Sequence, residues 1–207
     1  SKHTQQETEK AGLNCEMIYH GVDTKTFQPL NKEKIKEANN FQGKFIIGSV
    51  ARNQLRKMTP RLIQAFKLFA EDKDDALLLL HTTPLDPEGN NLIELFDRYQ
   101  LKNKVMISEK TSLAYGLSDP VMNTLYNTFD VHALTTSGEG FGLPILESMA
   151  CGIPNVLTDI TTSRELIEGR GELAKVQAMV MGNDNIERGL VDVKDFSDKL
   201  QILYDDR

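Results

Sequence analysis

The chain has 207 residues, of which 40% are hydrophobic and 26% charged, and it contains 14 Gly and 7 Pro. This composition is typical of a soluble globular domain and excludes a fibrous or disordered chain. The net charge of -6 argues against a general nucleic-acid-binding surface, and no apolar run has the length that crosses a bilayer. We therefore expect a cytoplasmic protein that does not bind nucleic acid.

The beginning of the chain has the pattern of a connection. We interpret residues 1–30 as a lead-in from a preceding domain, with a possible short strand at Glu16–His20. The charged stretch Asn31–Asn39 has a helical pattern. It opens a single domain for which we expect the bounds 31–207.

Beyond this stretch, short apolar runs alternate with segments of helical period. The expected strands are Lys44–Val50, Ala76–Thr82, Lys104–Ser108, Val131–Thr136 and Asn155–Thr158. The expected helices are Thr59–Glu71, with Thr59 as its cap, Glu88–Tyr99, Pro120–Thr128 and Pro144–Cys151. This alternation predicts an α/β fold, a Rossmann-like open parallel sheet with helices on both faces.

The tail beyond Gly169 is less regular. Short strands are candidates at Glu172–Val176 and Ala178–Met181, and a helix is a candidate at Asp195–Leu203. Two histidines of the central strands invite catalytic roles. His132 lies inside an apolar strand and is predicted to be a hydrogen-bonded interior residue, whereas His81 lies at a strand end and could reach a crevice.

The most informative segment runs from Ser137 to Gly152, SGEGFGLPILESMACG. It follows an expected strand, passes through a glycine-rich loop and enters a helix with Pro144 near its start. Glycines let a ligand approach the backbone, and the unpaired N–H groups of a first helical turn, together with the helix dipole, attract an anion. The segment therefore predicts a phosphate site.

Two carboxylates accompany this loop, Glu139 before the helix and Glu147 within it. At a helix start that faces a ligand, carboxylates can accept hydrogen bonds from sugar hydroxyls. The alternative is that both side chains only complement the positive end of the helix dipole.

A second anion-binding feature follows the first expected strand. The segment from Lys44 to Ala70 holds basic residues and no acidic one, and its loop carries Arg52, Arg56 and Lys57. If the two strands are parallel neighbours, this loop opens onto the same crevice as the glycines. Two cations there could neutralise a diphosphate where a metal ion would otherwise be needed. The alternative is a solvated basic loop.

These residues resemble the donor-binding domain of the retaining glycosyltransferase family 4, whose members have two facing Rossmann-like domains, the GT-B architecture. The resemblance covers nearly the whole chain. Its most specific part is Glu139–Glu147, two glutamates separated by seven residues, followed by the segment Ser148–Pro154. Gly21-Val22-Asp23 resembles the family's entry into its second domain.

The resemblance implies a role for each loop residue. Arg52 and Lys57 would hold the donor diphosphate. Glu139 would face the transferred sugar and, with these two cations, form the catalytic set. Glu147 would contact the ribose. The backbone N–H groups expected to line the donor are those of Gly140, Phe141, Gly142 and Leu143.

The resemblance also implies the reaction and its partners. A UDP-, GDP- or ADP-sugar would donate its sugar to a hydroxyl acceptor with retention of configuration, without a metal or other cofactor. A preceding domain would hold the acceptor, any peripheral membrane contact would come from parts outside this chain, and the isolated domain would be inactive. The segment Val105–Glu109 resembles the one whose backbone meets the base. Met58 departs from the family, which often has Gly or Asn there.

Three other functions remain to be weighed. The first is a catalytically inactive nucleotide-sugar-binding or regulatory module with the same fold. A dinucleotide-dependent oxidoreductase should have Gly-x-Gly-x-x-Gly after its first strand, where this chain has Ala51-Arg52-Asn53. A glycan phosphorylase should show a lysine context for its cofactor, which we do not find.

Overall fold

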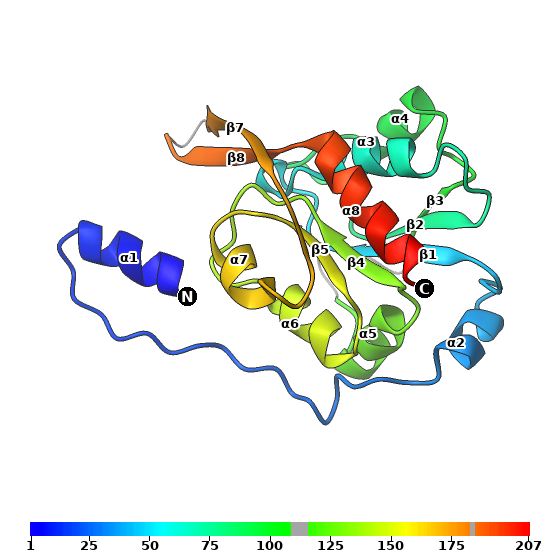
Figure 1. Cartoon of the computed structure of the whole chain (residues 1–207), viewed down its shortest axis with the longest axis horizontal. Coiled ribbons are helices and arrows are strands. Elements are labelled where there is room, and N and C mark those ends of the chain that lie inside the picture. Colours follow the sequence, from blue (N-terminus) through cyan, green and yellow to red (C-terminus); the bar gives the residue numbers. More distant parts are fainter. Residues whose placement is uncertain (109–115, 183–184) are drawn as a thin grey trace.

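A computed structural model describes residues 1–108, 116–182 and 185–207 of the chain. Its centre is a six-stranded parallel sheet of order β3-β2-β1-β4-β5-β6 (Figure 1). The strands are β1 Phe45–Val50, β2 Ala76–His81, β3 Val105–Ile107, β4 Val131–Leu134, β5 Asn155–Thr158 and β6 Glu172–Ala174. The strand order reverses between β1 and β4, which is the place where open α/β sheets bind ligands.

Helices cover both faces of this sheet, which confirms the predicted Rossmann-like class (Figure 1). On one face α3 and α8 pack against each other and over the sheet, in the largest apolar cluster, to which β1, β2, β4, β5 and β6 contribute. On the other face α5, α6 and α7 contribute to two smaller clusters. The helices are α2 Lys32–Ala38, η1 Leu55–Lys57, α3 Thr59–Phe69, α4 Leu92–Arg98, α5 Asp119–Tyr126, α6 Leu143–Ala150, α7 Thr162–Ile167 and α8 Val193–Asp205.

The central strands are buried because their side chains are apolar on both faces. Phe45 and Ile47 of β1 point into the larger cluster, and Ile46 points into the opposite one. Gly48 interrupts this run, and a Cβ on it would lie 2.2 Å from the ring of Phe129. The glycine therefore allows Phe129 to lie directly against β1.

Helix α3 carries the predicted apolar face but not the predicted cap. Its buried residues include Leu62, Ile63, Phe66 and Phe69. Thr59 is the first helical residue, and the cap position belongs to Met58, whose φ of 52° is left-handed and whose side chain makes no capping bond. The cap prediction was wrong because η1 ends immediately before the helix and sets the direction of the chain at Met58.

The two ends of the chain differ most from expectation. Helix α1 Lys2–Lys10 was not predicted, and Glu16–His20 forms no strand. No neighbouring strand in the described part of the chain pairs with that segment, and Ile18 is 86% exposed. The division into a lead-in and a domain stays a prediction, although Phe27 of the lead-in packs against Tyr126.

The tail forms an antiparallel hairpin that projects beyond the sheet (Figure 1). Its strands are β7 Val176–Met181 and β8 Glu187–Val191, of which β8 was not predicted. Beyond the hairpin, α8 returns to the sheet as expected. Among the described residues, no helix combines the length and apolar character needed to span a membrane.

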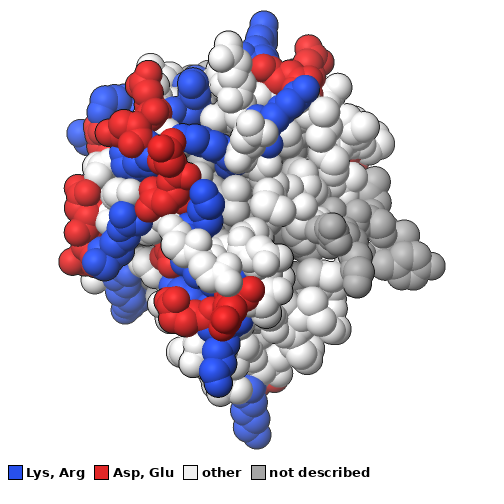
Figure 2. Space-filling view, turned by 90° about the vertical axis from the view of Figure 1, so that its right-hand side faces the viewer, with Lys and Arg blue, Asp and Glu red and all other residues white. Residues whose placement is uncertain are grey.

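The charged side chains on the right-hand side of the molecule are mixed in sign. Figure 2 shows Lys and Arg interspersed with Asp and Glu on this face, with no large area of one sign. Ion pairs such as Lys36 with Asp130 and Arg207 with Asp75 connect distant parts of the chain. Local compensation of this kind means that the net charge of -6 is not concentrated in one patch on this face.

Candidate functional site

Two loops meet where the strand order reverses. Residues 51–58 follow β1 and residues 135–142 follow β4, so both leave the carboxyl edge of the sheet. The Ser137 N–H and Oγ both donate to the carbonyl of Arg56 at 2.8 Å. Thr135 Oγ1 donates to the carbonyl of Met58 at 2.9 Å. These bonds join the cationic loop to the glycine loop.

The structure brings Lys57 and Glu139 into direct contact. Lys57 Nζ pairs with Glu139 Oε1, and Arg56 Nη1 lies 3.4 Å from Glu139 Oε2. The side chains of Lys57 and Glu139 are only 12% and 8% exposed, so water screens this pair weakly. Arg56, which the sequence prediction left out of the site, also donates to the carbonyl of Gly138 at 3.2 Å.

Arg52 lies apart from this cluster. Its Nε donates to Asp86 Oδ2 at 2.8 Å and its Nη2 donates to Asp86 Oδ1 at 3.3 Å, a two-point pairing. Its Nη2 is also 3.3 Å from Glu88 Oε1. The Arg52 hydrogen bond and the Glu88 N–H lower the pKa of the buried Asp86 carboxyl. The structure therefore does not place Arg52 against Lys57 or Glu139, and the sequence prediction missed Asp86.

The glycine loop presents free N–H groups. In the described part of the chain, the N–H groups of Gly140, Phe141, Gly142 and Leu143 find no hydrogen-bond acceptor. Gly142 holds the cap position of α6 with φ 96°, a conformation suited to glycine, and no side chain caps the helix. This helix start is therefore open to an anionic ligand.

Glu147 is held by a neutral partner. Tyr126, a fully buried residue at the end of α5, donates its hydroxyl proton to Glu147 Oε2 at 2.6 Å. Burial and the neighbouring Glu147 raise the pKa of the Tyr126 hydroxyl, so it stays a donor. Burial, followed by Glu147, raises the pKa of the Cys151 thiol to about 11. Sequence alone gave no signal for Tyr126, because its partner lies on another helix.

A polar network lies beneath the site. Asn155 Nδ2 donates to the Ile153 carbonyl at 3.0 Å, so Asn155 Oδ1 faces His132 Nδ1 at 2.8 Å and Ser148 Oγ at 3.0 Å. Burial lowers the pKa of His132 to about 4; the Asn155 bond opposes this shift and the charge of Lys57 adds to it. His132 is fully buried, and its predicted interior role is confirmed.

Other predicted residues contribute less to the site. His81 lies 3.1 Å from Ser108 Oγ, and burial lowers the pKa of the His81 ring. Of the segment Val105–Glu109, residues 105–107 form the edge strand β3, and Glu109 lies outside the described residues. Any contact of this segment with a base stays a prediction.

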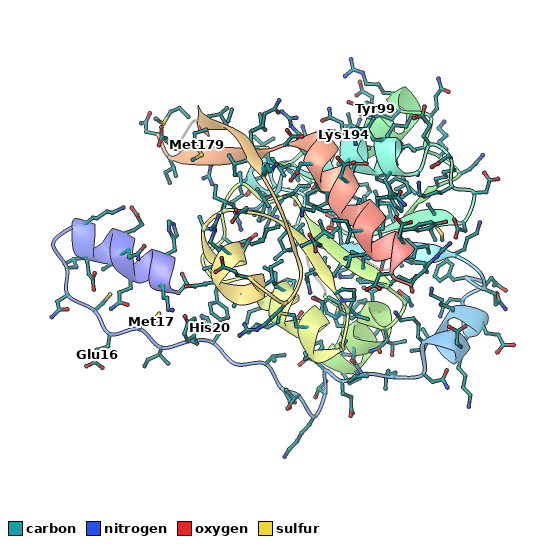
Figure 3. The ribbon with its side chains drawn as sticks, viewed as in Figure 1. Glu16, Met17, His20, Tyr99, Met179 and Lys194 are labelled. Carbon is teal, nitrogen blue, oxygen red and sulfur yellow. The ribbon has the colours of Figure 1, made fainter. Side chains whose placement is uncertain are left out.

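The N-terminal segment lies against the glycine loop. Thr4 Oγ1 donates to the carbonyl of Gly140 at 3.3 Å, and the Lys2 N–H donates to Glu165 Oε2 at 2.9 Å. His20, labelled in Figure 3 on the extended segment after α1, has its ring 5.0 Å from that of Phe141. Residues 1–20 thus contact the loop that carries the free N–H groups.

The sequence contains an Asp-x-Asp, Asp72-Lys73-Asp74, a pattern that can bind a divalent metal ion. It lies in the turn between α3 and β2, at the amino edge of the sheet, and Asp72 pairs with Lys73 at 2.6 Å. Across the described ranges, no group of three or more His, Cys, Asp or Glu side chains is arranged to hold a metal ion. The expected absence of a metal and of other cofactors stays a prediction.

A doubly wound parallel sheet with an open, glycine-rich helix start at its switch point defines the class of α/β nucleotide-binding domains. The family model "Glycosyl transferases group 1" matches residues 31–187. The chain therefore belongs to the group 1 glycosyl transferase family.

Curated relatives are longer than this chain. It is 27% identical over 162 residues to the lipopolysaccharide core biosynthesis mannosyltransferase LpsB of Rhizobium meliloti (strain 1021), an alignment that covers 75% of this chain and 44% of LpsB. It is also 27% identical over 150 residues to the mannosylfructose-phosphate synthase of Agrobacterium fabrum, which covers 69% of this chain and 32% of the relative. The chain thus spans less than half the length of these relatives.

Solved structures show the same fold. A C-terminal domain of a group 1 family protein (LpcC) from Francisella tularensis matches with a TM-score of 0.69 and 23% identity, covering 89% of this chain and 88% of that one. Anabaena Alr3699/HepE, solved in complex with UDP and glucose, matches with a TM-score of 0.78 and 21% identity, covering 100% of this chain and 52% of that one. The expected GT-B type of fold is confirmed.

Proposed function

We propose that this chain is the donor-binding domain of a glycosyltransferase that moves a sugar from a nucleoside-diphosphate sugar to a hydroxyl acceptor with retention of configuration. The observation that carries the proposal is the meeting of two features at one sheet edge. Lys57 contacts Glu139 there, and the N–H groups of Gly140–Leu143 follow directly without acceptors in the described structure. A cation beside open N–H groups suits a diphosphate.

The diphosphate is the group that the domain must stabilise. As the bond between the anomeric carbon and the diphosphate oxygen breaks, negative charge grows on the leaving group. Lys57 and the N–H groups of the α6 start supply positive potential at this edge, and such oriented charge lowers the barrier. Arg52 contributes less, because Asp86 and Glu88 pair with its guanidinium. In our proposal these groups replace a metal ion.

Lys57 and Arg56 pair with the Glu139 carboxylate. A bound diphosphate competes for these cations, because phosphate oxygens accept the same charge-assisted hydrogen bonds as a carboxylate. Glu139 is then free to accept hydrogen bonds from sugar hydroxyls. Donor binding thus replaces the ion pairs of Glu139 with ion pairs to phosphate, and sugar hydroxyls become the partners of the carboxylate.

The ribose is assigned to Glu147. Its carboxylate lies on α6, just beyond the N–H groups of Gly140–Leu143, and its hydrogen bond from Tyr126 holds it in one orientation. A fixed carboxylate can accept hydrogen bonds from two ribose hydroxyls, as acidic residues do in dinucleotide-binding domains. The base remains unassigned among uracil, guanine and adenine.

Retention is the finer part of the proposal. The acceptor hydroxyl would attack the anomeric carbon on the face from which the diphosphate departs, and its proton would pass to a leaving phosphate oxygen. One C–O bond breaks and another forms. A preceding domain would hold the acceptor, in keeping with relatives that extend well beyond this chain. The cytoplasmic location expected from the sequence stays a prediction.

The proposal is tested by calorimetry with UDP, GDP and ADP, each compared with its monophosphate. We expect one of the three bases to bind, and its diphosphate to bind at least tenfold more tightly than its monophosphate, because only the second phosphate reaches Lys57 and the N–H groups. Equal affinities, or no binding by any nucleotide, would overturn the assignment. Transfer to an acceptor, measured in the complete protein that carries this chain, separates the enzyme from an inactive binding module.

A further inference from the structure

Thr161 adopts a conformation that is normally reserved for glycine. It lies between β5 and α7 with φ 47° and ψ -125°. The Ser163 N–H donates to the Ile160 carbonyl at 3.0 Å, which closes a turn with Thr161 at its first central position. These angles are those of a type II′ turn, in which a Cβ at that position is crowded. A β-branched residue there is strained.

The strained turn directs two hydroxyl groups at Glu139. The Glu139 N–H donates to Thr161 Oγ1 at 3.1 Å. Thr162 Oγ1 donates to the Glu139 carbonyl at 3.1 Å. Two consecutive threonines therefore hold the backbone of one residue from both sides, although they are more than twenty positions away in the sequence.

These backbone contacts differ in kind from the contacts of the Glu139 side chain. The carboxylate is bound to Lys57 and Arg56, the cations that a donor diphosphate would attract. When those ion pairs loosen, the bonds from Thr161 and Thr162 remain. They would then fix the position of Glu139 relative to the sugar and the direction of the N–H groups that follow it.

We propose that Thr161 is a positioning residue for the donor sugar, whose hydroxyl keeps Glu139 in place after the cations turn to the diphosphate. The inference rests on the proposed function and deepens it, because it assigns recognition of the sugar to a residue outside the glycine loop. Strain of this kind persists only where surrounding interactions fix it, and it is concentrated at functional sites.

The test compares three substitutions of Thr161. Thr161→Val keeps the shape and the strained backbone but removes the hydroxyl, Thr161→Ser keeps the hydroxyl, and Thr161→Gly removes both the hydroxyl and the strain. Calorimetry measures each variant with a nucleoside diphosphate and with the matching sugar donor, using UDP and UDP-glucose, GDP and GDP-mannose, or ADP and ADP-glucose. The base is the one that the unaltered chain binds.

We expect Thr161→Val to bind the sugar donor about fivefold more weakly, the loss that corresponds to one neutral hydrogen bond, and to bind the diphosphate within twofold of the unaltered chain. Thr161→Ser should keep both affinities. Thr161→Gly should bind like Thr161→Val but unfold at a higher urea concentration than Thr161→Val, because its turn is relaxed. A purely structural role for Thr161 would alter unfolding without changing the gain in affinity that the sugar provides.

Thr124→Val is the matched control, because Thr124 is exposed on α5 and donates to the Pro120 carbonyl at 3.1 Å, away from the loop. It should change neither affinity. If the diphosphate and its sugar donor bind and Thr161→Val alters neither, the positioning role is wrong while the proposed function stands. If no nucleotide binds the unaltered chain, the proposed function itself fails, and the role of Thr161 fails with it.

Discussion

The loop that carries Glu139 and the helix that carries Glu147 are adjacent in the sequence but are held by different forces. Around Glu139, charged groups bind charged groups, and the backbone includes left-handed residues at Met58 and Thr161. Around Glu147, the contacts are hydrogen bonds made by uncharged, buried partners: Tyr126 donates to the carboxylate, and Ser148 and His132 bond to Asn155 Oδ1.

This difference separates the part of the site whose contacts must change when a ligand binds from the part whose contacts must be kept. Ion pairs can be exchanged for a ligand's charges with little net loss, whereas buried neutral bonds have no substitute when they are broken. We therefore expect substitutions in the Asn155 network to act on stability, and those of residues that would contact or orient the ligand to act on binding.

Asn155→Ala should cause the largest loss of stability. It leaves His132 Nδ1 and the Ile153 carbonyl without their Asn155 partner in the core and creates a small cavity. We expect the free energy of unfolding to fall by about 3–5 kcal/mol. Urea denaturation measures it. Asn39→Ala, at an exposed residue, should change it by less than about 0.5 kcal/mol. A loss below about 1 kcal/mol at Asn155 would show that the network is not structural.

The pH dependence of stability should reflect His132. Its pKa is about 4 in the folded chain, below its value in the unfolded chain, where the ring is exposed. As the pH falls from about 6.5 to about 4, the unfolded chain takes up a proton that the folded chain does not, so stability decreases. The loss should approach about 3 kcal/mol. Unfolding of His132→Gln over the same pH range provides the reference, and equal slopes would contradict the assignment.

Lys57→Ala should weaken nucleoside diphosphate binding by about 1–3 kcal/mol, because it removes a charge-assisted hydrogen bond to the phosphates. Calorimetry at two salt concentrations should show that the salt dependence also becomes smaller. Lys34→Ala, at an exposed position on α2, is the control. An unchanged affinity would remove Lys57 from the diphosphate site.

Tyr126→Phe tests the role of Glu147 by its effect on nucleotide binding. Loss of the hydroxyl frees the Glu147 carboxylate to rotate, and we expect binding of the ribonucleotide to weaken by about 1 kcal/mol. The 2′-deoxyribonucleotide should lose less, since it makes fewer hydrogen bonds to Glu147. Tyr99→Phe, at a hydroxyl that binds Gln64 on the far side of the sheet, is the matched control (Figure 3). Equal losses for the two nucleotides would contradict the ribose assignment.

Arg52→Ala should have the smallest effect on diphosphate binding, about 0.5–1 kcal/mol. Asp86 and Glu88 already neutralise the guanidinium, and its side chain is 45% exposed. Arg98→Ala on α4 is the control for general loss of positive charge. A loss at Arg52 larger than that at Lys57 would mean that Arg52 moves toward the phosphates on binding, and it would reverse our ranking of the two cations.

The order of the elements was predictable because parallel strands with crossover helices have a strong sequence pattern. The same pattern allowed the loops after β1 and β4 to be placed at one edge. The pairing of side chains was not predictable. Of the three cations in the first loop, sequence could not tell that Arg56 joins Lys57 at Glu139 while Arg52 turns to Asp86. That choice depends on the turn of η1, which no local pattern specifies.

Departures from the family pattern illustrate the same limit. With Met58 in this position, the path of the loop could not be predicted from the sequence. In the structure Met58 has the left-handed conformation that Gly and Asn adopt most readily. Asn155 begins an expected apolar strand, and it proves to be the centre of a buried network. Glu16–His20 contains an apolar run suited to a strand but pairs with no strand in the described part of the chain, so propensity alone misled there.

The bond between Ser148 and Asn155 has a mechanical consequence. Apolar packing tolerates small rotations of a helix about its own axis, because one methyl contact replaces another, whereas a hydrogen bond to a strand residue has a direction. Helix α6 is thereby set against β5 at one rotational angle. The direction in which its first N–H groups point is consequently fixed by a buried residue at the start of β5, away from the surface that a ligand would touch.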